Sequence, residues 1–388
     1  MTSCTEIREI AERYGTPSFV FDLKILTERF AEMRKIADGR YHLCYSIKAN
    51  PFLVPCMNEI ADNLEVCSPG ELAICKSLHV HPEKIIYSGV NKGEKDVTEA
   101  FAYGVCTFTA ESVNQFHLIS RIAEQMNKKV SVLLRLTSGT QFGMSEEDLL
   151  SLIEQREAHP YAQIDGIHFF AGTQQKKPEK KKKELAVLKA LFEKIRSEYG
   201  MELKKLEYGP GFPVPVFEDD DFSDTLKPMK DFHEILRETA EWADLTIETG
   251  RFISAECGTY ITRAADLKSS YCILDGGINH VSYIGQMMGM KVPVIRHLKT
   301  TDNTEKKEWI LCGSLCTVND VLVRKKELEG LSVGDILAFD HIGAYSVTEG
   351  IYLFLSRTMP SVILRENKNS FRLVRSPLET CDVNTPVI

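Results

Sequence analysis

The chain has 388 residues, of which 43% are hydrophobic and 26% are charged, so it can bury a large core in two or three domains. Its formal net charge of -8 argues against nucleic acid or an anionic membrane surface as the main partner. Residues 1–14 are polar and charged, unlike a secretory signal, and no stretch reaches the apolar length that spans a bilayer. The 11 cysteines are an odd number without the paired spacing of a zinc site, which predicts reduced thiols, a cytoplasmic location and no metal.

Short apolar runs alternate with segments of helical periodicity from residue 41 onward. The predicted strands are residues 41–48, 63–67, 84–88, 105–109, 130–136, 164–171, 203–208 and 244–248. The predicted helices are residues 51–61, 70–78, 92–103, 110–127, 145–155, 178–199 and 229–242, with a weaker one within 252–264. This alternation over roughly 250 residues predicts an α/β chain with a TIM-like (β/α)8 barrel, and a doubly wound open sheet is the competing architecture.

The pattern changes after residue 265, where short β-rich segments and turn signals replace the amphipathic helices. These segments are residues 270–274, 307–311, 336–339 and 350–356. They predict a second, mostly antiparallel β-domain, and we expect the strand at residues 18–22 to pair into it. The predicted domains are therefore a barrel of residues 24–265 and a β-domain of residues 1–23 and 266–388. The basic cluster at residues 176–183 is interpreted as a solvated helical face.

The reacting groups of such a barrel lie at the C-terminal ends of its strands. The predicted strand ends carry Lys48, Ser68, Arg135, His168, Phe170, the turn Gly209-Pro210-Gly211, and Glu248 with Gly250 and Arg251. Most lysines at strand ends are solvated, but a partly desolvated amine at a barrel mouth can form a Schiff base with an aldehyde. A glycine turn offers backbone N–H groups to a phosphate, although alone it is more often only a tight turn.

A Schiff-base lysine, a glycine turn and an arginine together suggest an aldehyde cofactor with a phosphate group, which describes pyridoxal 5'-phosphate. Glu248 then has a role beside the ring nitrogen, where a carboxylate keeps that nitrogen protonated. The alternative for Glu248 is a structural ion pair with Arg251 at the barrel rim.

Several motifs resemble those of the fold-type III pyridoxal-phosphate decarboxylases, the group of diaminopimelate, ornithine and carboxynorspermidine decarboxylases. Residues 45–50 (YSIKAN) resemble the cofactor-lysine motif, and residues 65–72 (EVCSPGEL) resemble the second-strand motif. Residues 248–251 (ETGR) resemble the Glu-Pro-Gly-Arg motif, with Thr249 in place of proline. The resemblance covers nearly the whole chain, from residues 14–22 to Gly343-Ala344-Tyr345, and it implies a barrel plus a β-domain.

The resemblance also implies roles for individual residues. Lys48 would carry the Schiff base and Glu248 would bind the pyridine nitrogen. The expected phosphate ligands are Thr173, Gly209, Gly211, Arg251 and Tyr345, and the further cofactor contacts are Ser68, Arg135, His168, Phe170 and Gly250. Residues 313–316 (GSLC) resemble the family's Gly-Pro-Leu-Cys stretch. This implies a homodimer in which Cys316 reaches the neighbouring subunit's site, with Asp320 close to the substrate; another small buried thiol is the alternative for Cys316.

Two stretches depart from the family pattern. Residues 168–173 (HFFAGT) stand where the family usually has His-x-His-x-Gly-Ser, so Phe170 can stack on the cofactor ring but cannot titrate. Residues 281–288 (VSYIGQMM) follow Asp275-Gly276-Gly277-Ile278-Asn279-His280, where diaminopimelate enzymes continue with an Arg-Pro stretch. The second departure favours a branch that acts in secondary-metabolite, siderophore or polysaccharide pathways, including enzymes that take carrier-tethered amino acids.

We therefore predict a carboxy-lyase that decarboxylates an amino acid with pyridoxal phosphate on Lys48. Cys316 or Lys48 would return the proton to the α-carbon. The sequence leaves open whether the substrate is a diaminopimelate-like or other basic amino acid, and whether it is free or bound to a carrier protein. One alternative is an amino-acid racemase on the same fold, against which Glu248 argues because alanine-type barrel racemases usually place arginine at the ring nitrogen. The other is a non-catalytic cofactor-binding or regulatory homologue, which the intact residue set disfavours.

Overall fold

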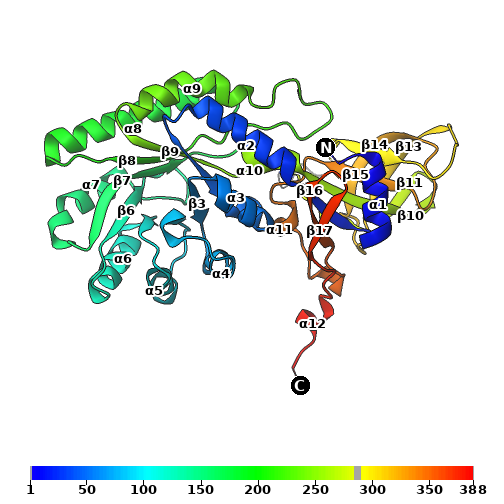
Figure 1. Ribbon diagram of the computed structural model, residues 1–388, viewed down its shortest axis with the longest axis horizontal. Helices are drawn as coiled ribbons and strands as arrows, with labels where there is room; N and C mark the ends of the chain where they lie inside the picture. Colours follow the sequence, from blue (N-terminus) through cyan, green and yellow to red (C-terminus); the bar gives the residue numbers. More distant parts are fainter. Residues whose placement is uncertain (1, 284–289, 388) are drawn as a thin grey trace. The chain divides into compact units, whose positions relative to one another are not determined.

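The structure is a computed structural model that describes residues 2–283 and 290–387, and its chain forms two compact units (Figure 1). The barrel unit comprises Phe30–Pro213 and Leu226–Phe252. The β unit comprises the residues up to Arg29, the segment Val214–Thr225 and the chain from Ile253 onward. Among the described residues, no helix combines the length and the apolar character needed to cross a membrane.

Eight parallel strands close into a barrel, which confirms the predicted (β/α)8 architecture and excludes the doubly wound sheet. The strands are β2 (His42–Ser46), β3 (Asn63–Val66), β4 (Ile85–Tyr87), β5 (Thr107–Ala110), β6 (Val130–Arg135), β7 (Ala162–Phe170), β8 (Lys205–Gly209) and β9 (Asp244–Thr249). The last strand pairs with the first, through Cys44 opposite Glu248 among other partners. Inside the barrel, Cys44, Ile86 and Leu133 form a small apolar cluster.

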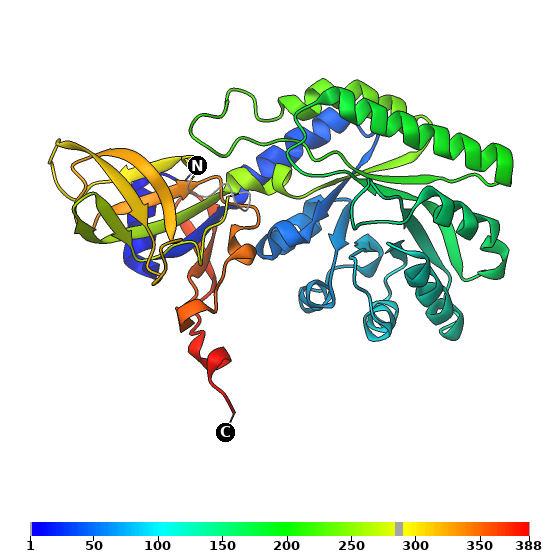
Figure 2. The ribbon, with the colours of Figure 1, turned by 180° about the vertical axis from the view of Figure 1, so that it is seen from behind.

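Helices follow the strands and cover the barrel. They are α2 (Leu23–Ala37), α3 (Val54–Ile60), α4 (Pro69–Ser77), α5 (Glu94–Tyr103), α6 (Val113–Gln125), α7 (Glu146–Glu154), α8 (Pro178–Tyr199) and α9 (Lys227–Ala240). Serine side chains cap several of them: the hydroxyls of Ser68, Ser112 and Ser145 accept the third backbone N–H of α4, α6 and α7. In Figure 2, the long helix α8 runs beside α9 on the outside of the barrel.

The helix predicted within residues 252–264 is confirmed only for its first residues. A single turn, α10 (Arg251–Ser254), and a 3-10 turn, η5 (Ala255–Cys257), lead directly into the long strand β10 (Gly258–Lys268). The strand begins Gly-Thr-Tyr-Ile-Thr, a run of β-branched and aromatic residues that suits a buried strand between two neighbours. β10 pairs with both β1 and β15, so sheet pairing outweighs the weak helical pattern.

The β unit contains a nine-stranded, mostly antiparallel sheet, as predicted. Its strands are β1 (Ser18–Asp22), β10, β11 (Tyr271–Leu274), β12 (Ile295–Leu298), β13 (Lys306–Cys312), β14 (Val321–Glu329), β15 (Ile336–Asp340), β16 (Ser361–Asn367) and β17 (Ser370–Arg375). The expected pairing of residues 18–22 into this sheet is confirmed, because β1 lies antiparallel to β10 and parallel to β16. Helix α1 (Cys4–Tyr14) packs Ile7 and Ile10 onto this sheet.

The predicted β-segment at residues 350–356 is wrong. It forms a 3-10 turn, η7 (Phe354–Ser356), after the short helix α11 (Ser346–Glu349). Leu355 and Ser356 have φ angles of 59° and 50°, which no extended strand can accommodate. A further short helix, α12 (Cys381–Asn384), follows β17.

Candidate active site

Lys48 lies just beyond β2, in the 3-10 turn η1 (Ile47–Ala49) at the C-terminal mouth of the barrel. Its Nζ donates hydrogen bonds to Glu65 Oε2 at 2.7 Å and to Glu248 Oε1 at 3.3 Å. The Lys48 side chain is 37% exposed, whereas the Glu65 and Glu248 side chains are only 3% and 7% exposed. Burial disfavours the ammonium form, but the two carboxylates outweigh burial and raise the pKa of Lys48 well above its usual value. Lys48 is therefore the cation of a buried acidic pocket.

Glu248 lies near the end of β9 and is held at both carboxylate oxygens. Its Oε1 accepts a hydrogen bond from Ser46 Oγ at 2.9 Å, and its Oε2 lies 3.0 Å from His168 Nε2. Burial alone would raise the pKa of Glu248, but the attraction of Lys48 and His168 holds it well below its usual range. A carboxylate fixed in this way stays ionised and keeps one orientation.

Glu65 was not predicted as a site residue, yet it makes the shortest contact with Lys48. It lies on β3, and the Sγ of Cys67, just beyond the end of that strand, lies 3.5 Å from Lys48 Nζ. The ligand atoms of Glu65, His168 and Glu248 lie within 4.8 Å of one another, a spacing that also suits a metal ion. The Lys48 ammonium already bonds both carboxylates of this trio, so the site holds a cation of its own.

Arg135 ends β6 and forms an ion pair with the buried carboxylate of Glu111, in the loop after β5. The same carboxylate accepts the backbone N–H of Gly143 at 3.1 Å, and the guanidinium lies 4.9 Å from the centre of the Phe142 ring. The charge of Arg135 is thus balanced within the barrel mouth by Glu111, another residue that sequence reasoning missed.

The loops after β7 and β8 meet backbone to backbone. A Cβ atom at Gly209 would lie 2.5 Å from the Phe170 ring, and one at Gly211 would lie 1.9 Å from the carbonyl oxygen of Gly172. Gly211 also has a φ of +55°, and its carbonyl accepts the backbone N–H of Gln175 at 2.8 Å. Only glycine fits these two positions. We call residues 171–175 and 209–212 the glycine cradle, and an anion such as a phosphate suits its close backbone.

Three of the other predicted barrel residues lie at this same end of the barrel. Thr173 is exposed in the glycine cradle, and Gly250 and Arg251 lead from β9 into α10. The hydroxyl of Ser68 accepts the backbone N–H of Glu71 at 3.1 Å, so in this structure it caps α4.

The remaining predicted site residues belong to the β unit. Asp320 is buried, and its carboxylate accepts the backbone N–H groups of Ile278 at 2.9 Å and Leu315 at 2.7 Å. It therefore shapes the loop that ends at Cys316, whose side chain is exposed. Tyr345 precedes α11 with a φ of 68°, a strained conformation of the kind that often marks functional sites. The structure thus brings Lys48 and His168 into contact with Glu248 in the barrel unit. Cys316, Asp320 and Tyr345 belong to the β unit.

Glu207 is the most unusual residue that sequence reasoning missed. It lies on β8 in register with His168 on β7, and both of its carboxylate oxygens are buried without a hydrogen-bond partner in the described chain. Burial, followed by repulsion from Glu248 and Glu65, raises its pKa well above the usual value.

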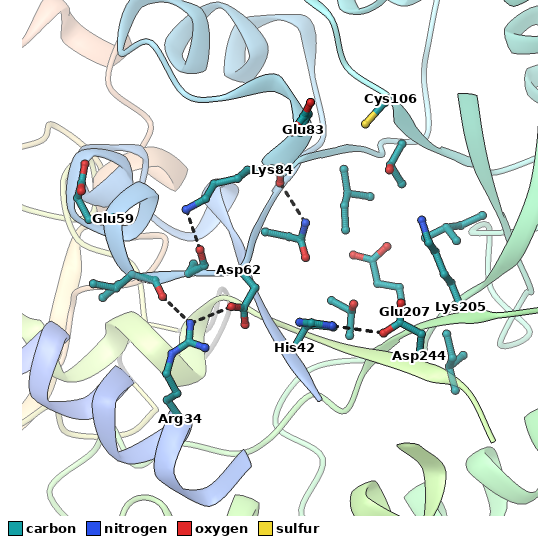
Figure 3. Close-up of a pocket in the computed structure, with 18 residues that line it drawn as sticks. Arg34, His42, Glu59, Asp62, Glu83, Lys84, Cys106, Lys205, Glu207 and Asp244 are labelled. Carbon is teal, nitrogen blue, oxygen red and sulfur yellow. Dashed lines mark hydrogen bonds and ion pairs between the residues drawn. The ribbon is translucent and has the colours of Figure 1, made fainter. Parts of the chain in front are cut away.

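A pocket of about 690 Å³ opens at the opposite, N-terminal end of the barrel strands (Figure 3). His42, Lys205 and Asp244 stand at its mouth as the first residues of their strands, and Glu207 projects into it from deeper in the barrel. No predicted site residue lines this pocket.

The chemical groups at the C-terminal barrel mouth are of the kind that hold pyridoxal phosphate: an amine between two buried carboxylates and a glycine cradle. The family model for the pyridoxal binding domain of pyridoxal-dependent decarboxylases matches residues 23–255. The chain belongs to this family.

Similar proteins agree with this assignment. The chain is 26% identical to the L-glutamyl-[BtrI acyl-carrier protein] decarboxylase of Niallia circulans, over 95% of this chain and 93% of that protein. It is also 26% identical to the diaminopimelate decarboxylase of Aquifex aeolicus, over 95% of this chain and 91% of that enzyme. A crystal structure of an Aquifex aeolicus protein aligns with a TM-score of 0.86 at 25% identity, covering 98% of this chain and 94% of that one. These findings confirm the predicted family, the decarboxylase class and pyridoxal phosphate as the cofactor.

Proposed function

We propose that this protein removes the α-carboxylate of an amino acid at the barrel mouth, with Lys48 as the residue that binds the cofactor covalently. The observation that carries the proposal is the position of Lys48 Nζ, 2.7 Å from Glu65 and 3.3 Å from Glu248 at the C-terminal end of the barrel. Pyridoxal phosphate supplies the electron sink that accepts the electron pair left when carbon dioxide departs.

Glu248 has the role of keeping the pyridine nitrogen of the cofactor protonated. Its depressed pKa makes it an anion over the whole physiological pH range, and an anion stabilises a proton on a neighbouring ring nitrogen. His168 and Ser46 hold the two carboxylate oxygens, so Glu248 cannot rotate away from this task. Lys48 and Glu65 form a hydrogen-bonded pair between which a proton could move.

The glycine cradle has the role of binding the cofactor phosphate. The proposed ligands are Thr173, Gly209, Gly211, Gly250, Arg251 and Tyr345. Phe170 lies against Gly209 and offers an aromatic face for the cofactor ring, where it can stack but cannot donate a hydrogen bond. Arg135 and Ser68 complete the proposed cofactor contacts at the ends of their strands.

Cys316 is the proposed proton donor to the α-carbon, supplied by the partner copy of a homodimer. Its exposed thiol stands in a loop that the buried Asp320 holds through two backbone N–H groups. We therefore assign Asp320 to the substrate region through its effect on this loop. An exposed thiol on the β unit is accessible to the barrel of a second copy.

Exposed apolar side chains support the homodimer. Ile351, Leu353, Phe354 and Leu355 are consecutive or nearly so, and all four are 44–49% exposed on the β unit. Apolar clusters of this kind mark protein–protein interfaces. Sedimentation equilibrium is expected to give a dimer for the wild type and a monomer for Phe354→Glu, and a wild-type monomer would refute the shared site. A cytoplasmic location agrees with a cysteine-containing chain that shows no disulfide among its described residues.

We propose an amino acid tethered to a carrier protein as the first substrate to test, ahead of free diaminopimelate. The Niallia relative is named for a carrier-linked glutamyl group, and this chain lacks the Arg-Pro stretch expected after residue 280. In the segment that replaces it, Val281 and Tyr283 are buried. Residues 284–289 lie outside the described residues.

The test is a carbon dioxide release assay on carrier-bound glutamate, glutamate, diaminopimelate, lysine, ornithine and arginine. Release from one of these, abolished in Lys48→Ala, supports the proposal. Loss of optical rotation without carbon dioxide would instead identify a racemase, and cofactor binding without either reaction would identify a non-catalytic homologue.

A further inference from the structure

One lysine of the basic cluster at residues 176–183 is not on a solvated helical face. Lys181 is only 4% exposed, although Lys180 and Lys182, its neighbours on α8, have half-exposed side chains. Lys183 is exposed as well. The interpretation of this cluster as solvated therefore fails for Lys181, and a buried cation requires a reason.

The Lys181 ammonium lies beneath the glycine cradle. Its Nζ donates a hydrogen bond to the carbonyl oxygen of Gln175 at 2.5 Å. It also lies 5.7 Å from the centre of the Phe212 ring and 5.9 Å from that of Phe232, distances typical of cation–π contacts. Gln175 belongs to the loop after β7 and Phe212 to the loop after β8, so one ammonium touches both loops of the cradle.

Gln175 links these loops directly. Its backbone N–H donates to the Gly211 carbonyl at 2.8 Å, and its side-chain Nε2 donates to the Ala171 carbonyl at 3.0 Å. Phe212 follows Gly211 in the chain. Lys181 therefore contacts Gln175, which links the two cradle loops, and Phe212, which follows Gly211.

Among the described residues, Lys181 has no ion-pair partner. In the part of the chain that the structure describes, no carboxylate lies within ion-pair distance of its Nζ. The acidic residue that acts electrostatically on Lys181 is Glu184. Its carboxylate accepts a hydrogen bond from the Tyr208 hydroxyl at 2.8 Å and lies 3.9 Å from Lys180 Nζ. Burying an ammonium among neutral groups is costly unless an anion lies nearby. A phosphate bound in the glycine cradle would place a negative charge near the Lys181 ammonium.

We propose that Lys181 is a positioning residue for the cofactor phosphate, which holds the two cradle loops together through Gln175 and Phe212 and adds a buried positive charge behind them. This inference rests on the proposed phosphate role of the cradle. Lys181 on α8 thereby adds a positive charge to a phosphate site in which the cradle offers mainly backbone N–H groups.

The test compares apoprotein variants in binding pyridoxal phosphate, pyridoxal and inorganic phosphate by calorimetry. Lys181→Met is expected to bind pyridoxal phosphate about tenfold more weakly or worse, and inorganic phosphate correspondingly. Pyridoxal, which has no phosphate, is expected to bind as it does to the wild type. Lys183→Met, on the same helix but exposed, is the matched control and is expected to change none of these affinities.

Lys181→Gln separates charge from scaffolding, because glutamine keeps a donor for the Gln175 carbonyl but has no charge. It is expected to fold and still to lose affinity for both phosphate-bearing ligands, which also covers the case in which Lys181→Met does not fold. Equal affinities of wild type, Lys181→Gln and Lys183→Met would overturn the inference while leaving the Lys48 site intact. A loss that extends equally to pyridoxal would also overturn it, because that result would mean general damage to the barrel. A wild-type apoprotein that binds none of the three ligands would overturn the proposed function itself.

Discussion

Replacing Glu207 with leucine is expected to stabilise the protein. The residue buries two carboxylate oxygens without a hydrogen-bond partner in the described chain, beside the apolar side chains of Ile86 and Leu133. An unsatisfied buried polar group costs about 1–3 kcal/mol. Leucine removes that cost and keeps most of the side-chain volume, so the free energy of unfolding at neutral pH is expected to rise by roughly 1–3 kcal/mol.

The sign of the pH dependence follows from the raised pKa of Glu207. A carboxyl group with a raised pKa in the folded state binds its proton more tightly there than in the unfolded state. Through this group, the free energy of unfolding therefore does not change with pH below its pKa in the unfolded state, about 4.3, and falls as the pH rises toward its pKa in the folded state. The advantage of Glu207→Leu over the wild type is therefore smallest at acidic pH and grows as the pH rises.

Urea unfolding of wild type and Glu207→Leu at several pH values between 5 and 8 measures this difference. Glu207→Gln is the control, because it removes the titrating group but keeps two unsatisfied polar atoms. This variant is expected to flatten the pH dependence of the free energy of unfolding, and to gain less stability than Glu207→Leu. A leucine variant that is less stable than the wild type at pH 8 would refute the reasoning, since it would mean that the carboxyl group is satisfied in the folded protein.

Three further predictions concern the active site. Lys48→Ala is expected to lose the visible absorbance of the bound cofactor and all turnover, and retained steady-state decarboxylation would exclude the proposed role. Glu248→Gln is expected to keep the cofactor but to lower kcat by about 10²–10³, as for the loss of a charge-stabilising group, measured by carbon dioxide release; an unchanged kcat would remove Glu248 from the mechanism. Glu65→Gln is expected to lower the pKa of Lys48, because Glu65 raises it. Apoprotein of this variant should therefore capture pyridoxal phosphate with a pH midpoint below that of the wild type, and a midpoint that moves to higher pH would contradict the ion-pair geometry.

The sequence predicts the barrel well because parallel strands buried on both faces leave long apolar runs with functional residues at their ends. Lys48, His168 and Glu248 lie at or just beyond the C-terminal ends of three separate strands, and they meet because those ends converge. Residues inside the barrel are harder to find. Glu65 and Glu207 stand within apolar runs, and nothing in a strand that is buried on both sides tells which side chains face the barrel axis.

The failures of prediction have local physical causes. Residues 252–264 have a weak helical pattern, but strand pairing on both edges of β10 determines their structure. Residues 350–356 carry apolar side chains, as a strand does, but Ile351, Leu353, Phe354 and Leu355 are exposed. Two positive φ angles prevent a strand there. Lys181 was hidden in a run of lysines, where composition indicates solvent and only the packing against Phe212 and Phe232 reveals burial.

The most direct test of the account is to locate the covalent bond to the cofactor. Purified protein loaded with pyridoxal phosphate is treated with borohydride, digested and mapped by mass spectrometry. The account predicts a single reduced pyridoxyl group, on the peptide that contains Lys48. A label on a different lysine, or no label on any peptide, would contradict it.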